Sequence, residues 1–318
     1  MANDIKLGVS LYSLTSEFVG EKKTIEGCLQ TVADMGFKGI EIVAAQMVPG
    51  YPNPSDEWLL HFRELLDKYG LEPVTYSAYI DYGLRTERDL NREEIIQFTY
   101  NDMIYAKKAG FPMVRTQHSI SPEILEEMVP ICRELDIKLT VEMHHPHHPG
   151  VEVWRKYLAL MNKYDCLGAV PDFSIFQHTP HRLLVERLIR AGFRRDKLEG
   201  VLRYHAARTP ADDAVRDLAL NAEEAQFTHD LYEKFNPTPL EALEELIPVS
   251  PYIHGKFYIL DSAEGDPCIP YDKILPKIKS LGYKGYIAAE YEGHHFDMTV
   301  DAKEQLKRYA SIFHKYID

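Results

Sequence analysis

Four residues that can bind a metal ion lie near the ends of predicted buried strands. Glu142 and Asp172 end the fifth and sixth of these strands, and His254 and Glu290 lie on the seventh and eighth. Carboxylates with one imidazole form a mostly oxygen donor set, which suits Mn²⁺ or Mg²⁺ and tolerates Co²⁺ or Zn²⁺. The pattern therefore predicts a divalent-metal site, with Mn²⁺ favoured. The alternative is that the acids at these strand ends are unrelated to one another and bind no metal.

The stretch 138–150, KLTVEMHHPHHPG, changes abruptly from an apolar strand to a loop with four histidines. Side chains alternate between the two faces of a strand, so Glu142 and His144 share one face. An imidazole titrates near neutral pH, which makes His144 or His145 the candidate catalytic base. Strand geometry favours His144, whereas Pro146 restricts His145 to extended conformations that can aim its ring. An exposed loop without catalytic function is the alternative.

Other polar residues lie near the same strand ends. Lys256 is a candidate catalytic residue that stabilises negative charge on oxygen, and an interior ion pair with one of the acids explains its position equally well. Glu41 is predicted to be a buried salt-bridge partner rather than a substrate contact. Arg115 can also stabilise oxyanion charge. The candidate substrate-binding residues are Tyr12, Arg115, Gln117 and His118.

A repeated unit of helix, glycine and buried strand positions these residues. The segments MGFKGIEIV (35–43) and LGYKGYIAAE (281–290) show this unit near both ends of the chain. Alternation of strands with helices predicts a parallel sheet, and eight units favour a closed α/β barrel, the (β/α)₈ TIM barrel, over an open sheet. No glycine-rich phosphate fingerprint follows a strand. The predicted strands lie within residues 7–12, 35–43, 73–79, 112–118, 138–150, 168–173, 252–258 and 286–290.

The predicted helices use ordinary start and stop signals. Ser121 and Pro122 indicate the N-cap and first residue of one helix that continues through Cys132. The segment 177–250 between strands six and seven is much longer than a normal connection. We predict a helical insertion there, with helices over 183–191, 211–235 and 240–247, inside a single barrel domain of residues 1–318.

Composition excludes several classes of protein. The net charge of −13 disfavours a nucleic-acid or anionic-membrane surface, since both need clustered Lys and Arg. The first residues, 1–6, lack the regions of a signal peptide, and no stretch has the roughly 18 apolar residues of a membrane span. These features predict a cytoplasmic protein. The four widely spaced cysteines are predicted to be buried apolar residues rather than disulfides or zinc ligands.

The order Glu142, Asp172, His254, Glu290 over strands five to eight resembles the xylose-isomerase-like superfamily of sugar isomerases, epimerases and dehydratases. That resemblance covers essentially the whole chain and implies a TIM barrel with a divalent metal held by these four residues. Two departures are present. Ile175 stands where related sequences often have a second histidine, and strand seven has His-Gly-Lys-Phe instead of His-x-Lys-Asp. The departures argue against a multinuclear site that cleaves phosphoesters.

A narrower resemblance rests on GVSLY (8–12), VAAQMVP (43–49), RTQH (115–118), EMHHPHHP (142–149) and the long insertion. These segments look like the large catalytic subunit of bacterial C-glycoside deglycosidases. The resemblance implies metal-dependent cleavage of the C–C glycosidic bond of a 3-oxo C-glycoside, by proton abstraction and β-elimination, and a small second subunit. A metal-dependent keto-sugar or cyclitol isomerase or epimerase is the alternative, because it shares the first step.

Two other classes of protein explain fewer of the candidate site residues. A non-enzymatic sugar- or cyclitol-binding barrel would have no functional metal site, and it would not retain stoichiometric Mn²⁺. A glycosidase that uses two carboxylates would not need His254 beside them. The pattern favours a metal-dependent lyase or isomerase that binds a small sugar or glycoside.

Overall fold

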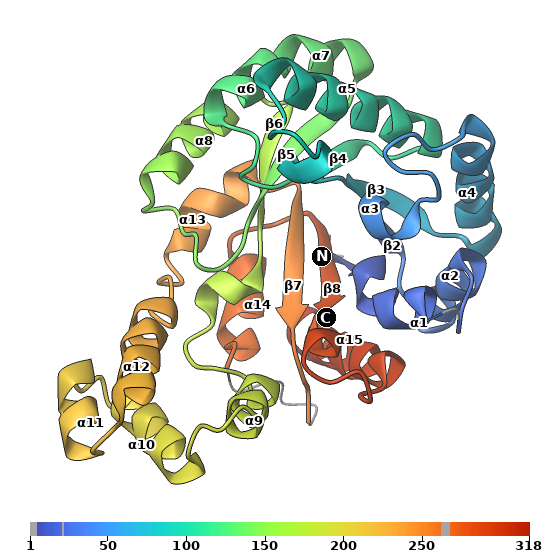
Figure 1. Ribbon diagram of the computed structural model, residues 1–318. Coiled ribbons are helices and arrows are strands. Elements are labelled where there is room, and N and C mark those ends of the chain that lie inside the picture. The colour runs from blue at the N-terminus through green and yellow to red at the C-terminus, as the bar shows by residue number, and fades with distance from the viewer. Residues whose placement is uncertain (1–4, 21, 262–267) are drawn as a thin grey trace.

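The computed structural model describes residues 5–20, 22–261 and 268–318, and residues 1–4 of the predicted N-terminal segment lie outside that part. Eight parallel strands form a single sheet surrounded by helices, as expected for a TIM barrel (Figure 1). The strands are β1 (Ile5–Ser10), β2 (Gly39–Val43), β3 (Glu72–Ser77), β4 (Met113–Thr116), β5 (Lys138–Met143), β6 (Leu167–Pro171), β7 (Tyr252–Phe257) and β8 (Gly285–Tyr291).

The strand order runs β6-β5-β4-β3-β2-β1-β8-β7, so only β6 and β7 lack a continuous ladder. A single parallel bridge between Asp172 and His254 joins these two strands. The bridge closes the sheet at its C-terminal edge, where both residues were predicted to bind a metal. The prediction of a barrel is confirmed. The strand pair that shares only one bridge, β6 and β7, lies directly beside the candidate site.

Most helices outside the insertion begin and end near the predicted signals. Gly70 and Gly110 follow α4 and α5 with φ of 62° and 88°, a conformation that glycine adopts without a Cβ clash. The helices of the barrel are α1 (Thr15–Val19), α2 (Ile25–Asp34), α3 (Ala44–Met47), α4 (Asp56–Tyr69), α5 (Arg92–Ala109), α6 (Pro122–Glu127), α7 (Val129–Leu135), α8 (Glu152–Lys163), α14 (Tyr271–Ser280) and α15 (Ala302–Ile317).

The sequence predicted a single helix from Ser121 through Cys132, and this prediction is wrong in one respect. Ser121 caps α6 as expected, since its hydroxyl accepts a hydrogen bond from the Ile124 amide. The helix stops at Glu127, and α7 begins at Val129 with Pro130 in its first turn. Proline has no N–H to continue the helical hydrogen bonds, so the segment divides there.

Between β6 and β7, four helices project from the barrel as an arm (residues 182–235), followed by α13, which returns to the barrel (Figure 1). The sequence prediction missed α10 and merged α11 with α12. Asn221 caps α12 in a capping box with Glu224, a signal that marks the missed break. These helices are α9 (Arg182–Arg190), α10 (Arg195–Ala206), α11 (Ala211–Asp217), α12 (Ala222–Lys234) and α13 (Ala242–Leu246).

Two apolar clusters hold the barrel together. A large core lies mainly between the sheet and its helices, and a smaller cluster lines the barrel interior beneath the predicted site, through residues such as Val74, Tyr252 and Tyr286. Inward residues alternate along a strand, so Tyr252, His254 and Lys256 follow one another up the inside of β7. Cys28, Cys132 and Cys268 are buried, and Cys166 is half-buried. Among the described helices, none has both the length and the apolarity needed to span a membrane.

Candidate metal centre and active site

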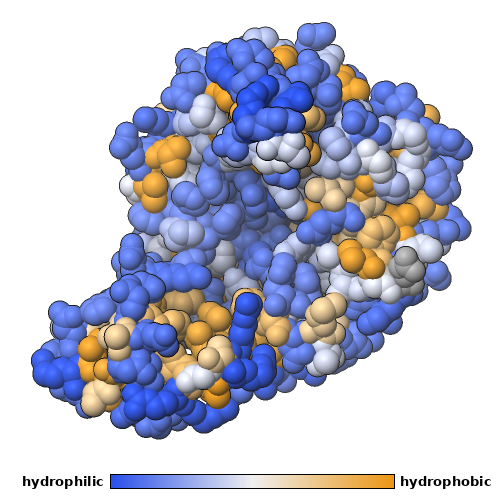
Figure 2. Space-filling view, in the orientation of Figure 1, coloured by the Kyte–Doolittle hydropathy of each residue, from blue (hydrophilic) through white to orange (hydrophobic). Residues whose placement is uncertain are grey.

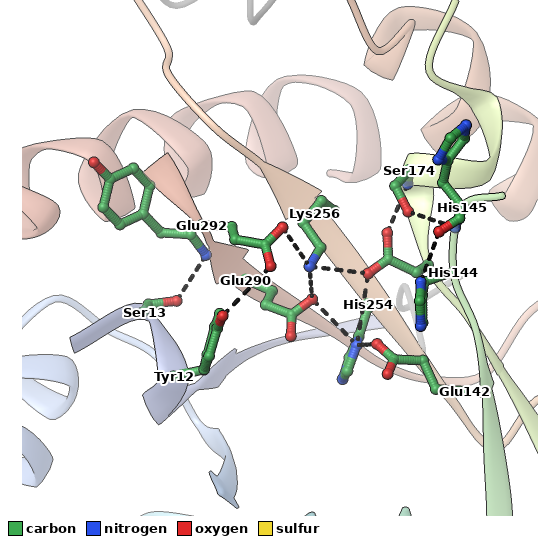
Figure 3. Close-up of polar contacts among 12 residues, drawn as sticks. Tyr12, Ser13, Glu142, His144, His145, Ser174, His254, Lys256, Glu290 and Glu292 are labelled. Carbon is green, nitrogen blue, oxygen red and sulfur yellow. Dashed lines mark hydrogen bonds and ion pairs between the residues drawn. The ribbon is translucent and has the colours of Figure 1, made fainter. Parts of the chain in front are cut away.

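The four predicted metal ligands meet at the C-terminal ends of β5 to β8. One side-chain ligand atom from each of Glu142, Asp172, His254 and Glu290 lies within 4.8 Å of the other three. His254 Nδ1 is the centre of the group (Figure 3), because it lies 2.8 Å from Glu142 Oε1, 3.2 Å from Glu290 Oε2 and 3.8 Å from Asp172 Oδ2. The barrel brings together donors that stand up to 148 positions apart in the chain.

The far side of the His254 ring is held by Glu41. His254 Nε2 lies 2.7 Å from Glu41 Oε2, and that oxygen also accepts a 2.8 Å hydrogen bond from the Tyr252 hydroxyl. A carboxylate on one ring nitrogen keeps the proton there and leaves the lone pair of the other nitrogen facing a metal. Glu41 therefore holds the His254 ring by a hydrogen bond, and its ion pair with Arg115 makes it the buried salt-bridge partner that the sequence suggested.

Arg115 joins the two acidic sides of the centre. Its guanidinium lies 2.6 Å from Glu142 Oε2 and 3.0 Å from Glu41 Oε1, and the side chain is buried. Burial alone would raise the pKa of Glu142, but Arg115 and His254 lower this pKa below its ordinary value. A substrate contact by Arg115 stays a prediction, and in the structure each of its two terminal nitrogens also meets a carboxylate.

The charges and unsatisfied atoms of the centre fit a divalent cation. With His254 neutral, four buried carboxylates face the two buried cations Arg115 and Lys256, which leaves 2 − 4 = −2; the acids are Glu41, Glu142, Asp172 and Glu290. Asp172 Oδ2 and Glu290 Oε2 make no hydrogen bond within the described part of the chain. Burial raises the pKa of Asp172 to about 7, although Lys256 opposes the shift. The Lys256 ammonium lies 3.5 Å from Asp172 Oδ2 and 3.0 Å from Glu290 Oε2, but one ammonium cannot neutralise both acids, so the excess of buried negative charge indicates a further cationic partner.

Asp172 is oriented by the turn that follows β6. Its Oδ1 accepts a 2.6 Å hydrogen bond from the Ser174 amide at the start of the 3-10 helix η3 (Phe173–Phe176). The Ser174 hydroxyl in turn accepts a 3.1 Å hydrogen bond from the His145 amide. This turn keeps Asp172 Oδ2 directed toward His254 and ties the β5 loop to the β6 loop.

Lys256 extends the centre toward Tyr12. Its ammonium lies 3.0 Å from Glu290 Oε2, 3.5 Å from Asp172 Oδ2 and 3.1 Å from Glu292 Oε2 (Figure 3). The Tyr12 hydroxyl donates to Glu292 Oε1 at 3.4 Å and also contacts the His295 ring. Lys256 has the interior ion pairs that were one of its two interpretations. The sequence interpretation missed Glu292, although it lies two positions beyond Glu290 and alternation predicts the same face.

The two candidate bases differ in their hydrogen bonds. His144 Nδ1 lies 2.8 Å from the carbonyl oxygen of His145, which can only accept, so Nδ1 carries the proton and Nε2 keeps its lone pair. The His145 ring uses Nε2 to contact the Lys234 carbonyl of the arm and stacks on Phe235. Each ring therefore keeps one nitrogen lone pair, Nε2 in His144 and Nδ1 in His145, and the difference is that the His145 ring is held by the arm whereas the His144 ring is not.

A cavity of about 350 Å³ opens above this centre, between the barrel and the arm. Figure 2 shows the hollow on this face, with hydrophilic residues around it and apolar residues on the arm. Its charged end includes Glu142, Lys256, Glu290 and Glu292, and both candidate bases line it. The rest of the wall includes Val43, Gln46, Tyr79, Gln177, His181, Leu184, Lys234, Phe235, Tyr258 and Phe296.

The predicted substrate contacts occupy different places. Tyr12, Arg115 and Gln117 line the cavity, and Gln117 donates a 3.3 Å hydrogen bond to Glu142 Oε2. His118 is exposed and does not line the cavity, because β4 ends at Thr116 and the chain turns outward. Its ring lies instead 4.5 Å from the His147 ring, and partial burial of this ring together with His144 lowers the pKa of His118.

Comparison with known families agrees with this architecture. A family described as xylose isomerase-like TIM barrel matches residues 29–197, more than half of the chain. The chain belongs to this family. The matched part contains Glu142 and Asp172, and the family confirms the fold expected from the strand pattern.

Two curated relatives cover nearly the full chain. The 3'-dehydrocarminate deglycosidase alpha subunit of a Microbacterium species is 30% identical over 95% of this chain and 92% of its own length. The C-glycoside deglycosidase alpha subunit of Arthrobacter globiformis is 30% identical over 99% of this chain and 93% of its own length. These relatives confirm the expectation that this xylose isomerase-like protein is an enzyme.

Solved structures show the same fold. The D-psicose 3-epimerase of Clostridium cellulolyticum superposes with a TM-score of 0.61 over 98% of this chain and 99% of that chain, at 10% identity. A sugar phosphate isomerase/epimerase from Parabacteroides distasonis superposes with a TM-score of 0.59 over 100% and 96%, at 14% identity. At these identities the likeness concerns the fold of the barrel.

Proposed function

We propose that this protein is the catalytic subunit of a metal-dependent C-glycoside deglycosidase, a lyase that acts on 3-oxo C-glycosides. The observation that carries the proposal is the convergence of His254 Nδ1 with carboxylates from three strands, directly below a cavity in which His144 keeps a free ring nitrogen. The substrate class comes from the names of the relatives that match over nearly the whole chain.

Glu142, Asp172, His254 and Glu290 would hold the cation, with Mn²⁺ as the favoured metal and Mg²⁺, Co²⁺ or Zn²⁺ as alternatives. A bound divalent cation supplies Lewis acidity, which polarises a sugar carbonyl and acidifies the adjacent C–H bond. His144 Nε2 takes the proton from C2 of the 3-oxo sugar. Lys256, at the charged end of the cavity, stabilises the negative charge that develops on oxygen.

The elimination then balances without an added oxidant or reductant. The electron pair of the broken C2–H bond forms the C1=C2 double bond, and the C1–aglycone carbon bond breaks. Its electron pair leaves with the aglycone carbon, which is protonated by the conjugate acid of His144 or by solvent. In the alternative function, a keto-sugar isomerase or epimerase, the same proton returns to the sugar and no bond to an aglycone breaks.

The relatives are named alpha subunits, which supports a second, small subunit for this protein as well. We place the assembly in the cytoplasm, and its small-molecule partner is a glycoside.

Metal content and turnover test the function together. Wild type, Glu142→Ala and His254→Ala are purified, and bound metal is measured by plasma mass spectrometry. Each protein is then supplied with Mn²⁺ and assayed with a 3-oxo C-glucoside and with ketohexoses. We expect metal and release of free aglycone in the wild type, and neither in the variants. Ketose interconversion without aglycone release would assign the isomerase function, and a wild type that neither binds nor responds to Mn²⁺ would overturn the metal site.

A further inference from the structure

Aromatic contacts attach the arm to the barrel at both of its ends, and they lie in the cavity wall. Where the arm begins, the His181 ring stacks on Tyr258 with centroids 3.9 Å apart and planes 12° apart. Where it ends, the Phe235 ring stacks on His145 at 5.8 Å and 20°. All four residues line the cavity. The arm is thus fixed to the barrel at the place where substrate must fit.

Both the ring and the backbone of His145 make contacts that hold this residue in place. Its ring Nε2 contacts the carbonyl of Lys234, the last residue of α12, and its backbone amide donates to the Ser174 hydroxyl at 3.1 Å. Its ring face is covered by Phe235. One residue therefore connects the β5 loop, the β6 loop and the end of the arm.

Phe235 belongs to the arm as much as to the cavity. It is buried in a small apolar cluster with Val201 and Leu231, separate from the main core, and Leu184 packs on that cluster and lines the cavity too. The Phe235 amide donates to the Leu231 carbonyl at 2.8 Å. A displacement of the α12 end would carry Phe235 with it and change the width of the cavity.

We propose that His145 is a positioning residue that docks the end of the arm onto the barrel and holds Phe235 in the cavity wall, where Phe235 limits the size of the group attached to the sugar. The contact between His145 and the end of the arm is inferred from the geometry alone. The limit on the size of the group attached to the sugar rests on the function proposed above. His144 then remains the proton-transferring histidine.

Three readouts separate positioning from catalysis. The first is hydrogen exchange of residues 222–238. The second is the exchange of the C2 proton of a 3-oxo sugar without an aglycone, followed in D₂O by NMR, because this step needs the base but not the arm. The third is KM for a 3-oxo C-glucoside with a large aromatic aglycone. The variants are His145→Ala, Phe235→Ala, their combination, and His144→Ala.

For His145→Ala we expect faster amide exchange in 222–238 and a KM for the large substrate lowered by about tenfold, because the ring that limits the size of the aglycone is no longer held in place. C2 exchange should stay within about twofold of wild type. Phe235→Ala should change KM similarly, and the double variant should add little because both act through one contact. His144→Ala should lose C2 exchange. His148→Ala, an exposed histidine of the same loop, is the matched control and should change none of the readouts.

Loss of C2 exchange in His145→Ala to the level of His144→Ala would overturn the positioning role and make His145 an acid–base residue. Unchanged amide exchange in 222–238 would overturn the docking contact. A KM for the large substrate that is unchanged or raised in both single variants would overturn the size limit. If wild type shows no C2 exchange, the proposed function fails and the size limit with it, while the hydrogen-exchange result still decides the docking contact.

Discussion

The barrel and the arm contribute opposite properties to one cavity. The barrel supplies charge through Glu142, His254 and Lys256 at its strand ends. Strand β5 is paired on both sides, whereas β7 is paired along β8 and joined to β6 by one bridge. The arm supplies apolar shape through Leu184 and Phe235, on helices that bury only a small cluster of their own. Rigid strands suit a site that must hold an ion, and an attached module can vary in shape without disturbing it.

The largest effect that separates the two regions is predicted for His254→Ala. This change removes the ring that lies between Glu41 and the three acidic ligands. We expect no retained metal and at least about a 10³-fold loss of turnover, since a bound cation contributes several kcal/mol to catalysis. His229→Ala, a half-exposed histidine on the arm, is the matched control and should keep its metal. Metal retained by His254→Ala would remove this residue from the ligand set.

Removal of the buried cation Arg115 from the barrel should destabilise the protein much more than removal of the half-exposed cation Arg194 from the arm. Arg115→Met leaves Glu41 and Glu142 buried without their partner, and we expect the free energy of unfolding of the metal-free protein to fall by roughly 3–5 kcal/mol. Arg194→Met breaks the Arg194–Glu224 pair of the arm, whose arginine side chain is 46% exposed, and should cost about 1 kcal/mol. Urea denaturation measures both. Equal losses would contradict the comparison.

A buried acid of the barrel that has no cationic partner among the described residues should destabilise the protein as pH rises. Burial raises the pKa of Asp102 on α5 to about 8, although a 3.4 Å hydrogen bond from Tyr51 opposes the shift. Between about pH 4 and pH 8 the folded state keeps a proton that the unfolded state has released. The unfolding free energy then falls by about 1.4 kcal/mol per pH unit from this group.

Asp102→Asn should remove that contribution and leave the rest of the protein unchanged. In urea titrations from pH 5 to pH 7.5, the stability of the variant relative to wild type should increase with pH. Parallel pH dependences of the two proteins would show that Asp102 does not hold a proton in the folded state.

The smallest effect should stay within the arm. Phe227 contacts Phe193 edge-to-face at 5.0 Å and packs against the small cluster of the arm. Phe227→Ala should lower the local opening free energy of α10 to α12 by roughly 1–2 kcal/mol, because this ring is only half-buried. Hydrogen exchange should accelerate in these helices and not in β1 or β8, and bound metal should be retained. Acceleration throughout the sheet would show one cooperative unit.

Much of the fold could be predicted because its signals are local. The capping residue Ser121 and the glycines that end α4 and α5 act on neighbouring backbone atoms, so their residue types alone indicate the helix boundaries. The helix break at Pro130 and the Asn221–Glu224 capping box were not predicted, although they too are local signals that the residue types indicate. The strand ends of Glu142, Asp172, His254 and Glu290 followed from the same pattern.

The sequence by itself determined which donor atoms exist and that they lie at the C-terminal ends of parallel strands, since strand alternation and helix punctuation depend on neighbours in the chain. Only the tertiary structure decided which partner each atom meets. Glu41 meets His254 across 213 positions, and the Lys234 carbonyl meets the His145 ring across 89. Such contacts depend on barrel closure and on how the arm packs, which long-range apolar burial sets and no local pattern records.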